Sequence, residues 1–174
     1  MIKLPEDDYH EVACLIQYLY TGDFALGSTD ERPEPYKGDQ SGQFAARVYV
    51  LADKYQIEGL KTVAAHKIIG LCNDQLLVRA FLKAAQVIYD NTASSDQIFR
   101  KQFKEAIKEV FIVKGGEQGD LAAAIKEILT GGGEIAFDIF DAQRAALFLP
   151  PPISTPLVDR SRVPAPPLAH PRPW

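Results

Sequence analysis

The residues of this chain that could perform acid–base, nucleophilic or metal chemistry are few and widely spaced. It contains three histidines, His10, His66 and His170, and two cysteines, Cys14 and Cys72. His10 and Cys14 stand four residues apart, so a helix would place both on one face, but no third metal ligand of a suitable type lies near them. Catalysis needs a nucleophile, a base or a metal cluster gathered in one pocket. The sequence therefore predicts no catalytic residue, no metal ligand and no cofactor, and argues against an enzyme.

The glycine-rich segments do not match known phosphate-binding loops. Residues 131–133 are three glycines, but the Lys and Ser/Thr that complete a phosphate loop do not follow them. The glycines of 115–119 lack the strand–turn–helix setting of a dinucleotide site. We interpret both segments as joints between helices, and no small-molecule substrate is expected.

The elements that must position any site are predicted to be helices. Val12, Leu15, Ile16 and Leu19 recur at i, i+3, i+4 and i+7, which predicts one apolar stripe on a helix over residues 8–21. Gly22 follows it and can adopt the left-handed conformation that ends a helix. Similar patterns predict further helices at residues 43–55, 58–72, 74–90, 96–113, 121–129 and 134–148.

Each later helix carries its own apolar stripe. The residues predicted to face inward include Phe44, Val48, Leu51, Tyr55, Leu60, Ala64, Leu77, Phe81, Ala84, Ala85, Ile88, Phe99, Phe103, Ile107, Val110, Ile125, Ile128, Leu129, Ile135, Ile139 and Ala142, with Phe148 as a further candidate. The run of Arg100, Lys101, Lys104 and Lys108 is predicted to form a solvated face. No internal repeat is evident in the sequence.

Two segments are predicted to lack regular structure. Residues 25–43 show no periodicity and are rich in Gly, Pro, Ser and Asp, which is typical of a surface loop. Nine of the 12 prolines lie within residues 150–174, which predicts a disordered, Pro-rich tail. Residues 164–167 have a minimal PxxP spacing, but neither neighbouring arginine stands at the offset that SH3 ligands use. The fold class expected for the whole chain is all-α.

Several sequence blocks also resemble a known family. They are LPEDD (residues 4–8), YLYTGDF (18–24), VYVLADKYQIEGLK (48–61), VIYDNTASSD (87–96) and EIAFDIFD (134–141). In this order and spacing the first three resemble the second half of a BTB/POZ domain, and the last two are similar to segments that follow that domain in its fungal branch. The resemblance covers about residues 2–141.

The resemblance implies a division of the chain. Residues 1–72 would be a partial BTB/POZ domain, residues 73–149 a helical extension and residues 150–174 the tail. The first half of such a domain, which contributes strands and much of its dimer interface, is expected to be missing here. The chain is therefore expected to be the helical C-terminal part of a fold that is mixed α/β when complete.

The resemblance also implies a function and a site. BTB proteins dimerise or recruit clients to cullin-based ubiquitin ligases, so a cullin scaffold and self-association are the implied partners. The family's docking groove maps onto Ile16, Gln17, Tyr20 and Asp23 of this chain. Tyr20 has an alternative interpretation, in which it packs in the core.

Composition is consistent with a protein-binding role. The net charge is −4, which argues against nucleic acid as the main partner because phosphate binding needs a cationic face. No apolar run approaches the roughly 20 residues of a membrane span, and two cysteines without framework spacing suggest reduced thiols in an intracellular protein, cytoplasmic or nuclear.

The second hypothesis is a truncated BTB fragment or mis-started gene product without independent activity, which would expose apolar helix faces.

Overall fold

The computed structural model describes residues 8–25, 40–73, 77–114 and 119–148. Across these residues every regular element is a helix: α1 (Tyr9–Thr21), α2 (Gln40–Lys54), α3 (Glu58–Gly70), the short 3-10 helix η2 (Leu71–Asn73), α4 (Val78–Asn91), α5 (Gln97–Lys114), α6 (Gly119–Gly131) and α7 (Gly133–Leu147). The all-α prediction is confirmed. Three further points remain predictions: the tail at 150–174, most of the loop at 25–43, and the division of the chain at residue 72. The tail and most of the loop lie outside the described residues.

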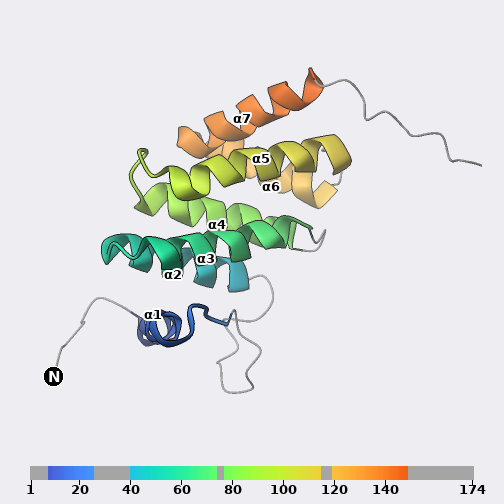
Figure 1. Ribbon diagram of the computed structural model, residues 1–174. Helices are drawn as coiled ribbons and strands as arrows, with labels where there is room; N and C mark the ends of the chain where they lie inside the picture. Colours follow the sequence, from blue (N-terminus) through green and yellow to red (C-terminus); the bar gives the residue numbers. More distant parts are fainter. Residues whose placement is uncertain (1–7, 26–39, 74–76, 115–118, 149–174) are drawn as a thin grey trace, which may run out of the picture.

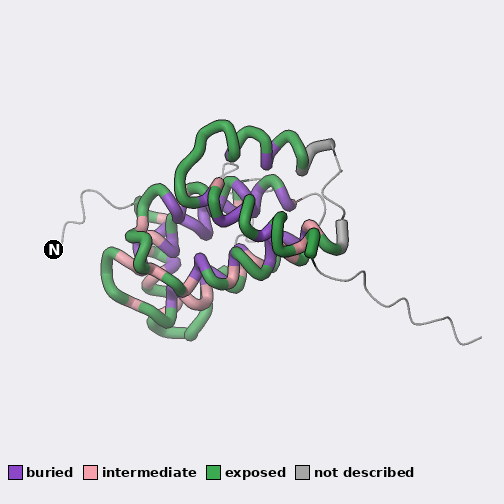
Figure 2. The backbone as a smooth tube through the Cα atoms, turned by 90° about the horizontal axis from the view of Figure 1, so that it is seen from above, coloured by how far each residue is buried: buried purple, intermediate pink, exposed green. Residues whose placement is uncertain are grey.

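The helices after α1 form a stack of pairs in two layers. One layer holds α2, α4 and α6, and the other holds α3, α5 and α7, with neighbours in each layer in contact (Figure 1). Helix α1 lies at one end of the stack against α2, and α7 lies at the other end (Figure 1). Buried residues gather where helices face each other, and exposed residues follow the outer sides (Figure 2). Among the described residues, the two helices at the ends of the stack, α1 and α7, therefore have helical neighbours on one side only.

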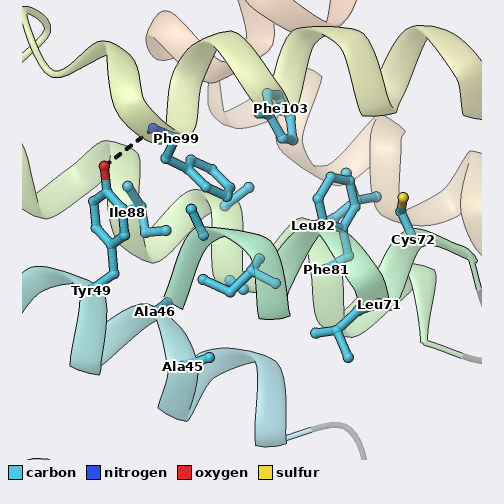
Figure 3. Packing of buried hydrophobic residues seen from close by; sticks show 14 of the residues in the cluster. Ala45, Ala46, Tyr49, Leu71, Cys72, Phe81, Leu82, Ile88, Phe99 and Phe103 are labelled. Carbon is cyan, nitrogen blue, oxygen red and sulfur yellow. Dashed lines mark hydrogen bonds between the residues drawn. The ribbon is translucent and has the colours of Figure 1, made fainter. Parts of the chain in front are cut away.

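The core between the layers is aromatic at its centre (Figure 3). The ring of Phe103 lies 5.5 Å from that of Phe81, 5.8 Å from that of Phe99 and 5.5 Å from that of Tyr89, measured between centroids. Tyr49 extends this group through an edge-on contact with Phe99 at 5.9 Å. Such offset and edge-on ring pairs stabilise a core beyond the area they bury. Most of the predicted inward stripes are confirmed, including Phe44, Val48, Phe81, Phe99, Phe103 and Ile139.

Two buried polar clusters tie the helix pairs together. In the first, the Tyr49 hydroxyl donates to Asp96 at 2.8 Å, and Lys61 bonds both Asp96 at 3.1 Å and Asp53 at 2.6 Å. Asp96 also caps α5 by accepting from the Ile98 amide at 3.3 Å. This cluster therefore joins α2 and α3 to the start of α5.

The second cluster has the same chemistry one helix pair further along. The Tyr89 hydroxyl donates to Asp138 at 2.6 Å, and Arg100 lies 4.1 Å above the Tyr89 ring while bonding Glu134 at 2.6 Å. In the first cluster Lys61 lies in the same way, 5.3 Å above the ring of Tyr49. In each cluster a tyrosine donates to an aspartate and a cation covers its ring, although no repeat is evident in the sequence.

The prediction that Arg100 belongs to a solvated face is wrong. Arg100 is 4% exposed, whereas Lys101 and Lys104 in the same run are exposed. Two contacts explain the difference: the guanidinium stacks on Tyr89 and reaches the Thr92 carbonyl at 3.2 Å. A planar guanidinium can cover an aromatic ring and still donate several hydrogen bonds, so it tolerates burial in such a setting.

Three other inward predictions are also wrong. Tyr55 follows the last residue of α2 and is 38% exposed, and Leu129 on α6 is similarly exposed. Phe148, at the C-cap of α7, is 82% exposed because it lies on the side of α7 that points away from α5. Helix α4 also begins at Val78, four residues after its predicted start at residue 74.

Candidate protein-interaction surface

Helix α1 has well-defined ends. The Asp8 side chain accepts a 2.8 Å hydrogen bond from the His10 amide, which satisfies one of the free amides at a helix start. At the other end Gly22 has φ = 74°, and its amide donates to the Tyr18 carbonyl at 2.8 Å. The predicted left-handed glycine after the helix is confirmed. The face that α1 presents is therefore that of a complete helix of 13 residues.

The inner face of α1 is not the stripe predicted from the sequence. Glu11 and Cys14 are buried, and Leu15 and Tyr18 pack against the core. The Glu11 carboxylate accepts a 2.6 Å hydrogen bond from Arg47 of α2, which orients the helix. Positions 11, 14, 15 and 18 have the same i, i+3, i+4, i+7 spacing as the predicted stripe, shifted by one residue. The prediction is confirmed for Leu15, which belongs to both stripes, and is wrong for Ile16 and Leu19, which are exposed.

The stripe left outside is strongly apolar. Tyr9, Ile16, Leu19 and Tyr20 lie between 49% and 88% exposed. At 100° per residue Tyr9, Ile16 and Tyr20 fall within one narrow sector of the helix, and Leu19 flanks it. We call these four residues the outer face of α1. Contiguous exposed apolar side chains of this kind mark surfaces that bind other proteins.

The four residues predicted for the docking site divide into two groups. Ile16 and Tyr20 lie on the outer face, and Tyr20 is its most exposed member, so the alternative that it packs in the core is wrong. Gln17 is exposed, and its side-chain oxygen accepts a hydrogen bond of 3.4 Å from the Ala25 amide. Asp23 bonds Lys67 of α3 at 2.8 Å. These two residues hold the chain after α1.

That chain segment anchors α1 to α3. Phe24 is buried, and the Lys67 ammonium lies 5.2 Å above its ring. The hydrogen bond from Lys67 lowers the pKa of the Asp23 carboxyl, and the Phe24 amide, which donates to Asp23 at 2.7 Å, acts in the same direction. Asp23 therefore helps to hold the end of α1 against α3. Tyr18 adds a second contact by lying over Gly59 of α3.

The chemistry-bearing residues stay apart in the fold. His66 is exposed on α3, and Cys14 and Cys72 are buried on α1 and η2. Within the described ranges, no three His, Cys, Asp or Glu side chains form a group that could hold a metal ion. The same ranges contain no helix with the length and hydropathy of a membrane span.

The sequence analysis missed a second exposed apolar face, on α7. Phe137, Phe140, Leu147 and Phe148 lie between 59% and 82% exposed. The inward stripe of α7 was predicted from Ile135, Ile139 and Ala142, which are buried. The outward face could have been predicted by noting that Phe137, Phe140, Leu147 and Phe148 do not belong to this inward stripe.

No family model, curated protein or solved structure matches this chain.

Proposed function

We propose that this chain is a non-catalytic protein-interaction module that binds its partner through the outer face of α1. The observation that carries the proposal is the exposure of Tyr9, Ile16, Leu19 and Tyr20 on one side of a helix whose other side is packed. Tyrosine combines a large apolar ring with a polar tip, and it is enriched among the residues that dominate binding energies. Two of the four are tyrosines at the ends of the face.

The rigidity of the helix supports the proposal. The ion pair from Glu11 to Arg47 fixes the start of α1, and the bond from Asp23 to Lys67 fixes its end. A partner that binds a pre-ordered helix loses little additional conformational entropy. The outer face is therefore suited to act as a docking surface without refolding.

The partner class follows from the resemblance to BTB/POZ proteins. In that family the corresponding helix end contributes to the groove that docks a cullin scaffold, and an adaptor of this kind would act inside the cell. We propose a cullin scaffold as the partner and substrate recruitment to a ubiquitin ligase as the role. Ile16 and Tyr20 would supply the apolar contacts, with Gln17 and Asp23 at the edge.

A pull-down with a purified cullin scaffold tests this role. We expect the full chain to bind and Tyr20→Ala to weaken binding at least tenfold, as is typical for an aromatic hot spot. Tyr55→Ala is the matched control, because Tyr55 is an exposed tyrosine that does not lie on α1. Absence of binding by the unmodified chain would reject the adaptor role.

The competing hypothesis is a fragment without activity of its own. It is favoured by the same outer face, since a preceding segment of a longer BTB protein would cover apolar residues on α1. The two hypotheses differ in solution: the fragment is expected to aggregate and to melt without cooperativity, whereas a module melts in one sharp transition. Circular dichroism during heating distinguishes them.

A further inference from the structure

The outward side of α7 carries a pattern that is complementary to itself. Phe137, Asp141, Arg144 and Phe148 are spaced by four, three and four residues, and at 100° per residue they share one narrow sector of the helix. Phe148 keeps a right-handed helical backbone at the C-cap, with φ = −94° and ψ = −2°, so it continues the stripe. All four side chains are exposed.

We propose that this stripe is a homodimerisation surface, on which α7 of a second copy packs antiparallel. Reversing the stripe about its midpoint exchanges Phe137 with Phe148 and Asp141 with Arg144. A two-fold axis at that midpoint would place Phe137 of each copy against Phe148 of the other. It would also place Asp141 of each copy against Arg144 of the other, so each contact occurs twice. Two-fold interfaces need this self-complementarity, because residue i meets residue j and j meets i.

The flanking residues satisfy the same symmetry. Phe140 and Leu147 lie on one side of the stripe, about 60–80° from Phe137. Because the two-fold axis runs between the helices and across them, this flank lies on the same side of the interface in both copies. Phe140 of one copy therefore comes beside Leu147 of the other. All four exposed apolar side chains of α7 are covered by one arrangement.

Charge on the stripe supports the antiparallel arrangement. Arg144 and Asp141 lie 3.4 Å apart within one helix, and both side chains are more than half exposed. Such a surface pair contributes little to the stability of the monomer. Asp141 and Arg144 are therefore available to pair with Arg144 and Asp141 of a second copy. Between buried phenylalanines, solvent would screen the attraction between these charges less.

The available area indicates a weak dimer. Three phenylalanines and a leucine, each presenting 59–82% of its surface, offer on the order of 500 Å² of apolar area per copy. Two copies would bury on the order of 1,000 Å² in total, at the lower end of specific interfaces. We therefore expect a dimer that forms in the micromolar range and dissociates on dilution.

The test is a charge exchange followed by analytical ultracentrifugation of the full chain. The unmodified chain should change from monomer to dimer as its concentration rises from about 1 to about 500 µM, a range centred on micromolar affinity. Asp141→Arg places two cations on the stripe and Arg144→Asp places two anions, so each variant alone should raise the dissociation constant at least tenfold. Because each changes only exposed residues, circular dichroism should show unchanged helix content.

The mixture of the two variants is the decisive measurement. When Asp141→Arg and Arg144→Asp chains are combined in equal amounts, the stripes become complementary and a heterodimer should form at least as tightly as the unmodified dimer. Phe137→Ser should abolish association in every combination. Tyr55→Ser, at an exposed tyrosine that lies on neither α1 nor α7, is the matched control and should leave the mass distribution unchanged.

Two results would overturn the proposal. A chain that remains monomeric across the concentration range would exclude a second copy as the occupant of the stripe. Association that survives both charge variants but is lost in Tyr20→Ser would move the interface to α1.

Discussion

The Tyr49 hydroxyl lies between Asp96 and the Phe99 amide, donating to the carboxylate at 2.8 Å and accepting from the amide at 3.2 Å. Figure 3 shows the bond to the Phe99 amide. One oxygen atom on α2 thus satisfies two groups at the start of α5. Tyr49 is fully buried, so water cannot replace it. This atom therefore links α2 to the start of α5.

Tyr49→Phe should therefore destabilise the fold with little change in shape. Loss of the hydroxyl leaves the Phe99 amide without this acceptor and removes one donor from Asp96, which should lower the free energy of unfolding by about 1–3 kcal/mol. Urea denaturation monitored by circular dichroism measures the loss. Tyr20→Phe is the control, because its ring is exposed, and it should change stability by less than about 0.5 kcal/mol.

The same cluster predicts how stability depends on alkaline pH. Burial raises the pKa of Tyr49 far above its ordinary value of 10.0, and the hydrogen bond to Asp96 adds to the increase; Tyr89 behaves alike beside Asp138. Below about pH 10 both phenols are protonated whether the chain is folded or not. Above it the unfolded chain loses protons that the folded chain keeps, so stability must fall as pH rises.

Denaturant titrations between pH 8 and pH 11 check this dependence. The double variant Tyr49→Phe and Tyr89→Phe should be less stable at pH 8 but should lose stability less steeply above pH 10. Lys61 leaves a residual slope: burial would lower its pKa, but its bonds to Asp53 and Asp96 outweigh burial and raise it above 10.5. Equal slopes for the variant and the unmodified chain would refute the assignment.

Arg100 should contribute more to stability than any neighbour in its basic run. Arg100→Ala removes the cover from Tyr89 and the bonds to Glu134 and Thr92, and should cost about 3 kcal/mol. Arg100→Lys should recover only part of this, since lysine lacks the planar guanidinium whose two terminal nitrogens reach Glu134 and Thr92 while it covers the ring of Tyr89. Lys101→Ala is the matched control and should be nearly neutral. Thermal unfolding of the three variants ranks them.

The sequence predicts the helices of this fold well, because apolar periodicity and glycine punctuation act locally. The helix at 96–113 was predicted within one residue of α5 at each end, and its stripe of Phe99, Phe103 and Ile107 is buried. Helix α2 begins three residues before its predicted start, at Gln40, within the segment expected to be a loop. Gly42 in that segment is buried against α4, a contact that local pattern cannot reveal.

The candidate surfaces were harder to predict because both depend on which side of a helix finds a neighbour. On α1 the stripes beginning at Glu11 and Val12 have equal spacing, and contacts with other helices, such as that of Glu11 with Arg47 and that of Tyr18 with Gly59, accompany the first. Hydrophobicity alone therefore placed Ile16 and Leu19 inside, whereas the structure leaves them outside. Arg100 is the converse case, since its burial depends on a tyrosine 11 residues away in sequence.

The contact between α2 and α4 provides the most direct test of the stack. A Cβ atom added at Gly42 would lie 2.7 Å from the Ala80 carbonyl oxygen and 3.0 Å from a methyl group of Leu71. The first is backbone, so it cannot move aside as a side chain can. Gly42→Ala should therefore push the two helices apart and cost about 1–3 kcal/mol, even though alanine favours a helix.

Gly70→Ala, near the same end of the molecule's core but with nothing within 4 Å of the added atom, is the matched control. It lies in α3 and should be neutral or stabilising by up to about 1 kcal/mol. Close packing of α2 on α4 requires that Gly42→Ala lower the melting temperature and that Gly70→Ala leave it unchanged or raise it, which thermal unfolding measures. If Gly42→Ala were as benign as Gly70→Ala, the two helices would have to be further apart than this stack places them.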